Sequence, residues 1–255
     1  MAAFSLDGKI IKEHKFPTDH DYGQFLKDIE RECKNLSEFK FEACCVAAPG
    51  TIDRKAGVVR KFGNIPWQNV PIAKDLGDIL DHKVMIENDA NLAALSEALL
   101  VQDKYKRVVY ITLSTGIGAK IIINGMISQE FADVEAGFMI FEHEGKLTEW
   151  EEFASGQALK DKYGKLASEI EDPAIWKEYA ANVARGLYEL IDLWYPEVVI
   201  IGGGVGAHFE KFEAPLKESL AKYRSRMTTI PPIIKAKRPE EAVVYGCYDF
   251  IKQSV

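Results

Sequence analysis

The feature that most constrains the fold is a long helical pattern followed at once by a short apolar run. Large apolar side chains recur at helical spacing across 174–195, which predicts an amphipathic helix that faces a core. Pro196 ends this helix, and the chain continues as an apolar stretch that ends in glycines, "EVVIIGGG" (197–204). A strand that is apolar on both faces needs cover on both sides. The pattern therefore predicts an α/β fold with mainly covered sheets.

The rest of the chain alternates between strand and helix signals. Asp7-Gly8 between two apolar runs predicts a β-hairpin. The other expected elements are helices over 22–36, 90–100 and 241–253 and strands over 41–48, 83–87 and within 107–127. The polar stretch "VQDKYKR" (101–107) marks the break expected if the chain forms two lobes.

Composition excludes several classes of protein. The chain has 255 residues, 47% of them hydrophobic, and a formal net charge of −7. An acidic balance argues against a broad surface for nucleic acid or anionic lipid. No apolar run approaches the ~20 residues that span a bilayer, the amino terminus lacks the apolar centre of a signal peptide, and no C-x-x-C pair occurs. We therefore expect a cytoplasmic protein with no membrane, nucleic-acid or thiolate-metal partner.

Polar side chains crowd the end of one predicted strand, in "VMIENDANLAAL" (84–95). An Asp at this junction suits a helix N-cap, which is worth about 1 kcal/mol. It equally suits a ligand site, because open α/β sheets bind ligands at the carboxyl ends of strands. Glu87, Asn88, Asp89 and Asn91 lie together, and their burial is costly unless they bind something. The crowding favours a functional role for Asp89 over capping alone.

Two glycine loops are candidates for holding phosphate. In "TLSTGIG" (112–118), glycines let backbone N–H groups converge on an anion and Thr112, Ser114 and Thr115 add hydroxyls. A tight hairpin turn explains this loop equally well. The second loop, "IIGGGVGAHF" (200–209), follows a strand and precedes a predicted helix, whose amino end favours anions.

The second loop also matches the dinucleotide pattern G-x-G-x-x-G/A through Gly202, Gly204 and Ala207. A dinucleotide-binding unit places an acidic residue at the end of another strand ~20 residues later. The segment that follows here is helical and charged, "KFEAPLKESLAKY" (211–223). A nicotinamide-dependent oxidoreductase therefore lacks its structural context.

Two further carboxylates, Glu135 and Glu151, have apolar and aromatic neighbours in sequence. Carboxylates beside Trp and Phe suit a carbohydrate site, where they accept hydrogen bonds from hydroxyls, although single acidic residues are more often surface groups. His143 lies between Glu142 and Glu144 and is expected in a solvated loop.

Taken in order, these segments resemble the ROK family of sugar kinases, which have a ribonuclease-H-like, actin/hexokinase-type ATPase fold with two lobes around a cleft. The matching segments cover nearly the whole chain: "AAPGTID" with "GVV" (47–59), "GNIPW" (63–67), "ENDANLAALSEAL" (87–99), "TLSTGIGAKIIINGMI" (112–127), "EAGFMI" (135–140), "EEFASGQAL" (151–159) and "VVIIGGGV" (198–205). The resemblance implies a small amino-terminal lobe, 1–103, completed by a helix within 241–255, and a larger lobe, 104–240.

The resemblance also implies roles for single residues. Asp89 would be the general base that takes the proton of a sugar hydroxyl while that hydroxyl attacks the γ-phosphoryl group of ATP, with Mg²⁺ neutralising charge. Sugar hydroxyls would be held by Asn64, Asn88, Glu135 and Glu151. The nucleotide would be bound by Thr112, Thr115 and Gly116 in the phosphate motif and by Gly202, Gly203 and Gly204 near the adenosine.

Two departures from the family pattern shape the expectation. Phe138 occupies the position of a family histidine, and "FEHEGKLTEWEEF" (141–153) holds no cysteine, so no structural zinc is predicted. The family's first strand and D-x-G-G-T-K loop are not in this sequence, and "AAFSLDGKII" (2–11) matches its second strand. The neighbours of that strand are then expected to lack ladder partners on one side, and a second chain that fills the gap would give a homodimer.

The leading hypothesis is thus ATP-dependent phosphorylation of a hexose or an N-acetylhexosamine. The alternative is a sugar-binding relative that is impaired in or lacks catalysis, because the phosphate loop is absent. A nicotinamide-dependent oxidoreductase is a distant third. The particular sugar, and ATP rather than polyphosphate as donor, stay open.

Overall fold

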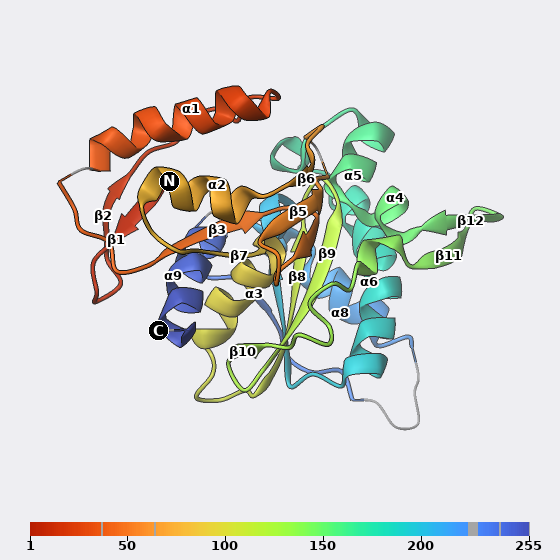
Figure 1. Ribbon diagram of the computed structural model, residues 1–255. Helices are drawn as coiled ribbons and strands as arrows, with labels where there is room; N and C mark the ends of the chain where they lie inside the picture. Colours follow the sequence, from red (N-terminus) through yellow and green to blue (C-terminus); the bar gives the residue numbers. More distant parts are fainter. Residues whose placement is uncertain (37, 64, 224–228, 240, 255) are drawn as a thin grey trace. The chain divides into compact units, whose positions relative to one another are not determined.

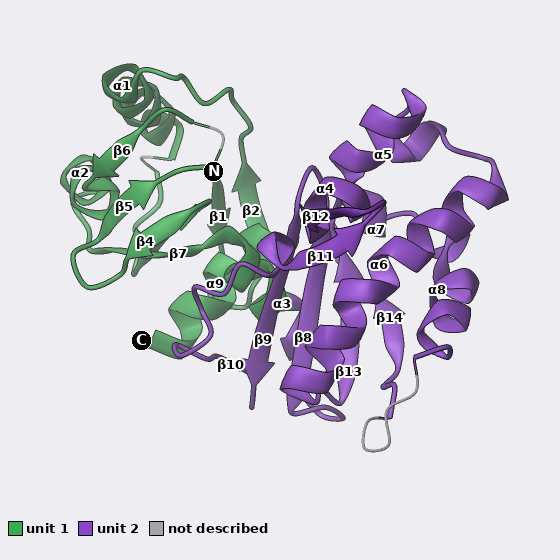
Figure 2. Cartoon of the chain, turned by 90° about the vertical axis from the view of Figure 1, so that its right-hand side faces the viewer, with its two compact units in different colours: residues 1–96, 243–255 green, residues 97–242 purple. Residues whose placement is uncertain are grey.

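The computed structural model describes residues 1–36, 38–63, 65–223, 229–239 and 241–254. Two compact units are distinguished: unit 1 comprises residues 1–96 and 243–255, and unit 2 comprises residues 97–242 (Figures 1 and 2). The chain therefore passes between the units twice, at 96–97 and at 242–243.

Unit 1 contains short strands and four helices within the described residues. They are β1 (Ala2–Phe4), β2 (Ile10–Glu13), α1 (Tyr22–Cys33), β3 (Cys44–Ala48), β4 (Thr51–Asp53), β5 (Val58–Lys61), β6 (Gln68–Val70), α2 (Ile72–Leu80), β7 (Val84–Asn88), α3 (Asp89–Leu99), whose last turn belongs to unit 2, and α9 (Ala242–Ser254).

The predicted hairpin at Asp7-Gly8 is confirmed. Strands β1 and β2 pair antiparallel, and Gly8 supplies the positive φ of +84° that the turn requires. The rings of Phe4 and Tyr248 stack at 5.1 Å, and Tyr248 Oη donates to Leu6 O at 2.8 Å, so α9 holds the hairpin from within unit 1. A hydrophobic core under α1 and α2 holds the rest of the unit together.

The parallel pair β3–β7 positions the candidate site of unit 1. Cys44 pairs with Val84 and Ala48 with Asn88, so both strands end at the same level. Among the described residues β3 has β7 as its single partner strand, and β1 and β2 form a sheet of their own.

Unit 2 contains a larger sheet and its helices. Its elements are β8 (Arg107–Leu113), β9 (Ile117–Ile123), β10 (Met126–Ile127), β11 (Ile140–His143), β12 (Lys146–Glu149), α4 (Trp150–Ala154), α5 (Gly156–Tyr163), α6 (Pro173–Trp194), β13 (Val198–Gly202), α7 (Gly203–Gly206), α8 (Glu213–Leu220) and β14 (Ile233–Lys235).

The sheet of unit 2 has the order β10-β9-β8-β13-β14. Strand β13 runs parallel to β8 and to β14, and β9 is antiparallel to β8. All five residues of β13 are buried, as the continuous apolar run predicts. In its register Gly202 pairs with Thr112, so the two predicted nucleotide loops leave neighbouring strands at the same edge.

Helix α6 is the long helix predicted from the sequence, and it confirms that prediction. Asp172 caps its amino end by accepting the backbone N–H of Ala174 at 2.8 Å, and Pro173 occupies its first turn. Tyr195 ends it in the left-handed conformation at φ 47°. Its apolar face packs with α8 and the sheet into one core (Figure 2).

One local expectation is confirmed and one is wrong. A helix follows the glycine loop, as the sequence predicts, and this helix, α7, is a single turn. His143 does not lie in a solvated loop: it ends β11, and 22% of its side chain is exposed. Its ring stacks on Phe153 at 4.3 Å, and Arg185 Nη1 lies 3.2 Å from its Nδ1. Phe153 and Arg185, which come from two other elements and which the local sequence does not reveal, cover this histidine.

Candidate functional site

The predicted base lies where β7 meets α3 in unit 1. Directly before it, Glu87 is fully buried, with 0% of its surface exposed. Arg54 binds this carboxylate with two hydrogen bonds, from Nε to Oε2 at 2.8 Å and from Nη2 to Oε1 at 2.7 Å. Asn91 Nδ2 adds a third at 2.9 Å. A two-pronged, charge-assisted ion pair offsets the cost of burying a carboxylate.

Asn88, not Asp89, caps helix α3. Its Oδ1 accepts the backbone N–H groups of Ala90 at 3.0 Å and of Asn91 at 3.2 Å, which is the bonding pattern of an N-cap. Asp89 is the first helical residue and is half-buried, and its Oδ1 accepts the N–H of Ala90 at 2.8 Å. Because Asn88 caps the helix, capping does not explain why position 89 is an aspartate.

The crowding of polar groups at this junction has an internal explanation. Glu87, Asn88 and Asn91 satisfy one another and Arg54, so their burial does not by itself require a ligand. The sequence reasoning missed Arg54. A glutamate at the end of a buried strand needs a cation as its partner. The sequence indicates this need but does not show which residue meets it.

The predicted nucleotide loops lie together in unit 2. The turn 114–116 joins β8 to β9, and Gly203 lies against the end of β8. A Cβ on Gly203 would lie 2.4 Å from Leu113 O and 2.7 Å from Thr112 Oγ1, and its φ is +83°. A glycine is thus required here for the two loops to approach each other.

Helix α5 closes the other side of the same turn. Gly156 N–H donates to Ser114 O at 2.6 Å, and a Cβ on Gly156 would lie 2.8 Å from Val205 Cγ2. The segments 114–116, 156–157 and 203–205 therefore meet in unit 2. The hydroxyl side of the turn is open, since Thr115 is exposed.

Glu151 lies beside this turn. Its Oε2 accepts the backbone N–H of Ile117 at 3.1 Å. A Cβ on Gly116 would lie 2.6 Å from that oxygen, and one on Gly137 would lie 2.7 Å from it. Glycines on two elements therefore make the space that the carboxylate occupies, and Glu151 links the turn 114–116 to the segment that carries Glu135.

Glu135 precedes the short 3-10 turn Ala136–Phe138, and its side chain is 48% exposed. Lys120 of β9 lies beneath it, with 2% of its surface exposed. The Lys120 ammonium donates to Ala132 O at 3.0 Å and to Val134 O at 2.9 Å, and lies 3.8 Å from Glu135 Oε1. Lys120 was not among the residues predicted from the sequence, although a lone lysine inside an apolar strand indicates a buried cation with a specific role. Phe138, at the family's histidine position, is 54% exposed.

The predicted site residues thus form one group in each unit. Unit 1 holds Asn88 and Asp89, and Asn64 lies outside the described residues. Unit 2 brings together Thr112, Thr115, Gly116, Glu135, Glu151, Gly202, Gly203 and Gly204.

Within the described part of the chain, no group of three or more His, Cys, Asp or Glu side chains is arranged to hold a metal ion. No helix there is both long and apolar enough to cross a membrane.

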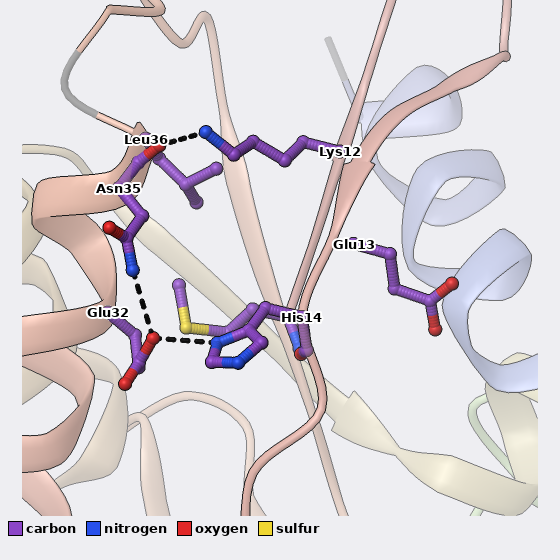
Figure 3. Close-up of a pocket in the computed structure, with 7 residues that line it drawn as sticks. Lys12, Glu13, His14, Glu32, Asn35 and Leu36 are labelled. Atoms are coloured by element: carbon purple, nitrogen blue, oxygen red, sulfur yellow. Dashed lines mark hydrogen bonds and ion pairs between the residues drawn. The ribbon is translucent and has the colours of Figure 1, made fainter.

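Unit 1 also has a cavity of ~200 Å³ between β2 and the carboxyl end of α1 (Figure 3). Its polar groups bind one another: Glu32 Oε2 lies 2.6 Å from His14 Nδ1 and 3.1 Å from Asn35 Nδ2. Glu13 points away from this group in Figure 3. None of the predicted site residues lines the cavity, so it is separate from the candidate site.

Comparison with solved structures identifies the fold. Among solved structures, a ROK family glucokinase from Streptomyces griseus, in complex with glucose and AMPPNP, superimposes with a TM-score of 0.82 at 24% identity, covering 99% of this chain and 95% of that one. A ROK family protein from Streptococcus pneumoniae, in complex with sucrose, gives a TM-score of 0.85 at 24% identity, covering 99% and 93%. The chain therefore has the ribonuclease-H-like fold of the actin/hexokinase class, as the sequence predicts.

The sequence comparisons identify the family. The ROK family model matches residues 1–254, and the chain belongs to this family. The glucokinase of Thermotoga maritima is 28% identical over 295 residues, spanning 98% of this chain and 93% of the glucokinase. The N-acetyl-D-glucosamine kinase of Haemophilus influenzae is 26% identical over 285 residues, spanning 96% and 93%.

Proposed function

We propose that this protein transfers the γ-phosphoryl group of ATP to a hydroxyl of a hexose or an N-acetylhexosamine, with Asp89 as general base. The observation that carries the proposal is the division of roles at the β7–α3 junction. Asn88 caps the helix and Arg54 neutralises Glu87, so Asp89 is needed for neither task. The nearly full-length similarity to a glucokinase and an N-acetyl-D-glucosamine kinase supports the same chemistry.

Asp89 would accept the proton of the attacking hydroxyl. Its Oδ1 already accepts the N–H of Ala90 at 2.8 Å, which fixes the orientation of the carboxylate at the start of α3. A positioned carboxylate of this kind contributes roughly 10²–10⁴-fold to a proton-transfer step. Asn64, Asn88, Glu135 and Glu151 would bind the other hydroxyls of the sugar.

The nucleotide would be bound by the two loops of unit 2. Thr112, Thr115 and Gly116 would bind phosphate with hydroxyl and backbone N–H donors, and Gly202, Gly203 and Gly204 would lie near the adenosine. The close approach of Gly203 to Thr112 supports a shared binding surface. Polyphosphate as the phosphoryl donor is the competing possibility within this proposal.

Mg²⁺ fits this arrangement as a partner of the nucleotide. In phosphoryl-transfer sites it is held by substrate phosphates, waters and one or two carboxylates, so the absence of an acidic cluster among the described residues does not conflict with it. When bound, it neutralises charge on the transferred group. The protein's own residues then bind, orient and deprotonate the sugar.

The direct test incubates the protein with Mg²⁺, either ATP or polyphosphate, and glucose, fructose, mannose or an N-acetylated hexosamine. Sugar-dependent release of ADP supports a kinase, and the sugar with the highest kcat/KM defines its substrate. Absence of phosphorylated product with every donor and sugar contradicts the proposal.

The second candidate is a sugar binder without kinase activity. The chain is also 27% identical over 241 residues to a xylose repressor of Caldicellulosiruptor bescii, spanning 79% of this chain and 60% of the repressor. Calorimetry separates the two functions. Binding heat with a sugar, together with no phosphoryl transfer, favours the binder.

A further inference from the structure

Lys120 has an environment that packing does not explain. It lies on β9, where its neighbours Ala119 and Ile121 face the hydrophobic core of unit 2 from the other side of the sheet, and 2% of its own surface is exposed. A buried ammonium group costs several kcal/mol unless it is paired and hydrogen-bonded. An apolar side chain of similar length, such as Met, would fill the same space without this cost.

Three contacts of the Lys120 ammonium come from one short segment. The ammonium donates to Ala132 O at 3.0 Å and to Val134 O at 2.9 Å, and lies 3.8 Å from Glu135 Oε1. The carbonyls belong to the connection that leads from β10 to the turn Ala136–Phe138. Lys120 therefore fixes the backbone immediately before Glu135 and places a positive charge beside its carboxylate.

The far side of the same turn is fixed as well. Gly137 lies against Ile117 O and Glu151 Oε2, at 2.4 Å and 2.7 Å from the position a Cβ would take. The backbone is thus fixed on both sides of Glu135, at residues 132–134 and at Gly137. The side chain of Glu135 stays 48% exposed, so a ligand can reach it. A carboxylate that is held in one orientation accepts hydrogen bonds from two adjacent hydroxyls, which is the pattern that a sugar presents.

We propose that Lys120 is a positioning residue for Glu135 and thereby sets the affinity of this protein for the sugar. The identity of the ligand rests on the proposed function, whereas the ordering of residues 132–135 by Lys120 does not. Lys120 acts on the ground-state binding of the sugar and takes no part in proton or phosphoryl transfer. Its loss is therefore expected to raise KM for the sugar more than it lowers kcat.

The test uses Lys120→Met, Glu135→Gln and the double variant, with Lys106→Met as the matched control. Lys106 is an exposed lysine of the same unit, whose ammonium donates to Gln102 O at 2.7 Å. Lys120→Met is expected to raise KM and the calorimetric Kd for the sugar about tenfold or more, with kcat and KM for ATP within about threefold. Lys106→Met is expected to change none of these values.

The double variant distinguishes positioning from a general loss of structure. If Lys120 acts through Glu135, adding Lys120→Met to Glu135→Gln weakens sugar binding by much less than it does in the wild type. Additive effects, or equal losses in kcat and in KM for both substrates, overturn the proposal.

A second readout needs no ligand. Amide hydrogen exchange across residues 128–138 is expected to quicken at least tenfold in Lys120→Met and to be unchanged in Lys106→Met. Unchanged exchange in Lys120→Met overturns the positioning role even if the protein binds no sugar. Failure of the wild-type protein to phosphorylate or bind any sugar, with the exchange result as expected, overturns the proposed function and leaves the ordering role standing.

Discussion

At the scale of single residues, Asp89 shows what the sequence can and cannot determine. The motif around it predicts a strand that leads directly into a helix, and β7 and α3 confirm this junction, while the role of Asp89 stays a prediction. The burial of polar groups beside Asp89, however, is explained by Arg54, which binds Glu87 from more than thirty positions earlier in the chain. Long-range pairing of this kind depends on the fold, so the sequence identifies the need for a cation without identifying the residue.

The pair formed by Arg54 and Glu87 supports a prediction at this scale. Arg54→Met leaves a fully buried carboxylate without its cation, so it is expected to lower the free energy of unfolding of unit 1 by about 3–5 kcal/mol. Urea unfolding monitored by circular dichroism measures the loss.

The double variant Arg54→Met with Glu87→Gln is the control. It removes both charges, so it is expected to recover a large part of the stability lost in Arg54→Met. If the double variant is no more stable than Arg54→Met, the ion pair is not the cause of the loss.

At the scale of secondary-structure elements, the length of a strongly periodic segment is predictable from the sequence, whereas the length of a short glycine-rich helix is not. The helix predicted over 174–195 is α6, at Pro173–Trp194, because its apolar face, its Asp cap and its terminal Pro196 all agree. The helix expected after "IIGGG" is one turn long. Glycine permits many backbone conformations, and contact with the turn 114–116 selects this one.

Tyr179 on α6 supports a prediction about this element. It is 3% exposed, burial raises the pKa of its hydroxyl, and among the described residues its Oη has no hydrogen-bond partner. Tyr179→Phe keeps the ring packing against Trp176 and Phe212 and removes an unsatisfied polar atom. The free energy of unfolding is expected to stay equal or to rise by about 1–2 kcal/mol.

Tyr163→Phe is the control for Tyr179→Phe within the same unit. It removes a hydrogen bond from Tyr163 Oη to Glu178 Oε2 at 2.9 Å and is expected to lower the free energy of unfolding by about 0.5–1.5 kcal/mol. Thermal or urea unfolding of both variants gives the comparison. A destabilised Tyr179→Phe would show that its hydroxyl has a partner in solution.

At the scale of the whole molecule, the sequence predicts the family fold because motifs in a fixed order constrain topology more strongly than any one motif does. The ROK family model spans residues 1–254, and the predicted fold is confirmed. The site residues stay predictions, since their roles depend on a bound sugar and nucleotide. The predicted dimer likewise stays a prediction.

The carboxylate of Glu197 supports a prediction about how the free energy of unfolding depends on pH. Backbone N–H groups of Lys106 and Arg107 lower the pKa of Glu197, which fastens the start of β13 to the start of β8. A lowered folded-state pKa means that this stabilisation is fully present above the unfolded-state pKa of about 4.3. It is lost as the pH falls through the lower folded-state pKa.

Glu197→Gln is therefore expected to be less stable than the wild type at pH 7, and the difference is expected to shrink as the pH falls below about 4.3. Urea unfolding at pH 7, 5 and 3.5 measures it. A difference that is constant across this range contradicts the assignment of the stabilisation to the Glu197 carboxylate.

The role of Asp89 as general base is tested by measuring kcat for sugar phosphorylation in Asp89→Asn, beside the calorimetric Kd for the sugar. Asp78→Asn, an exposed change in the same unit, is the control. If Asp89 is the general base, kcat falls by about 10²–10⁴-fold while the sugar Kd changes little, and Asp78→Asn behaves as the wild type. An Asp89→Asn protein that phosphorylates the sugar at the wild-type rate contradicts the account.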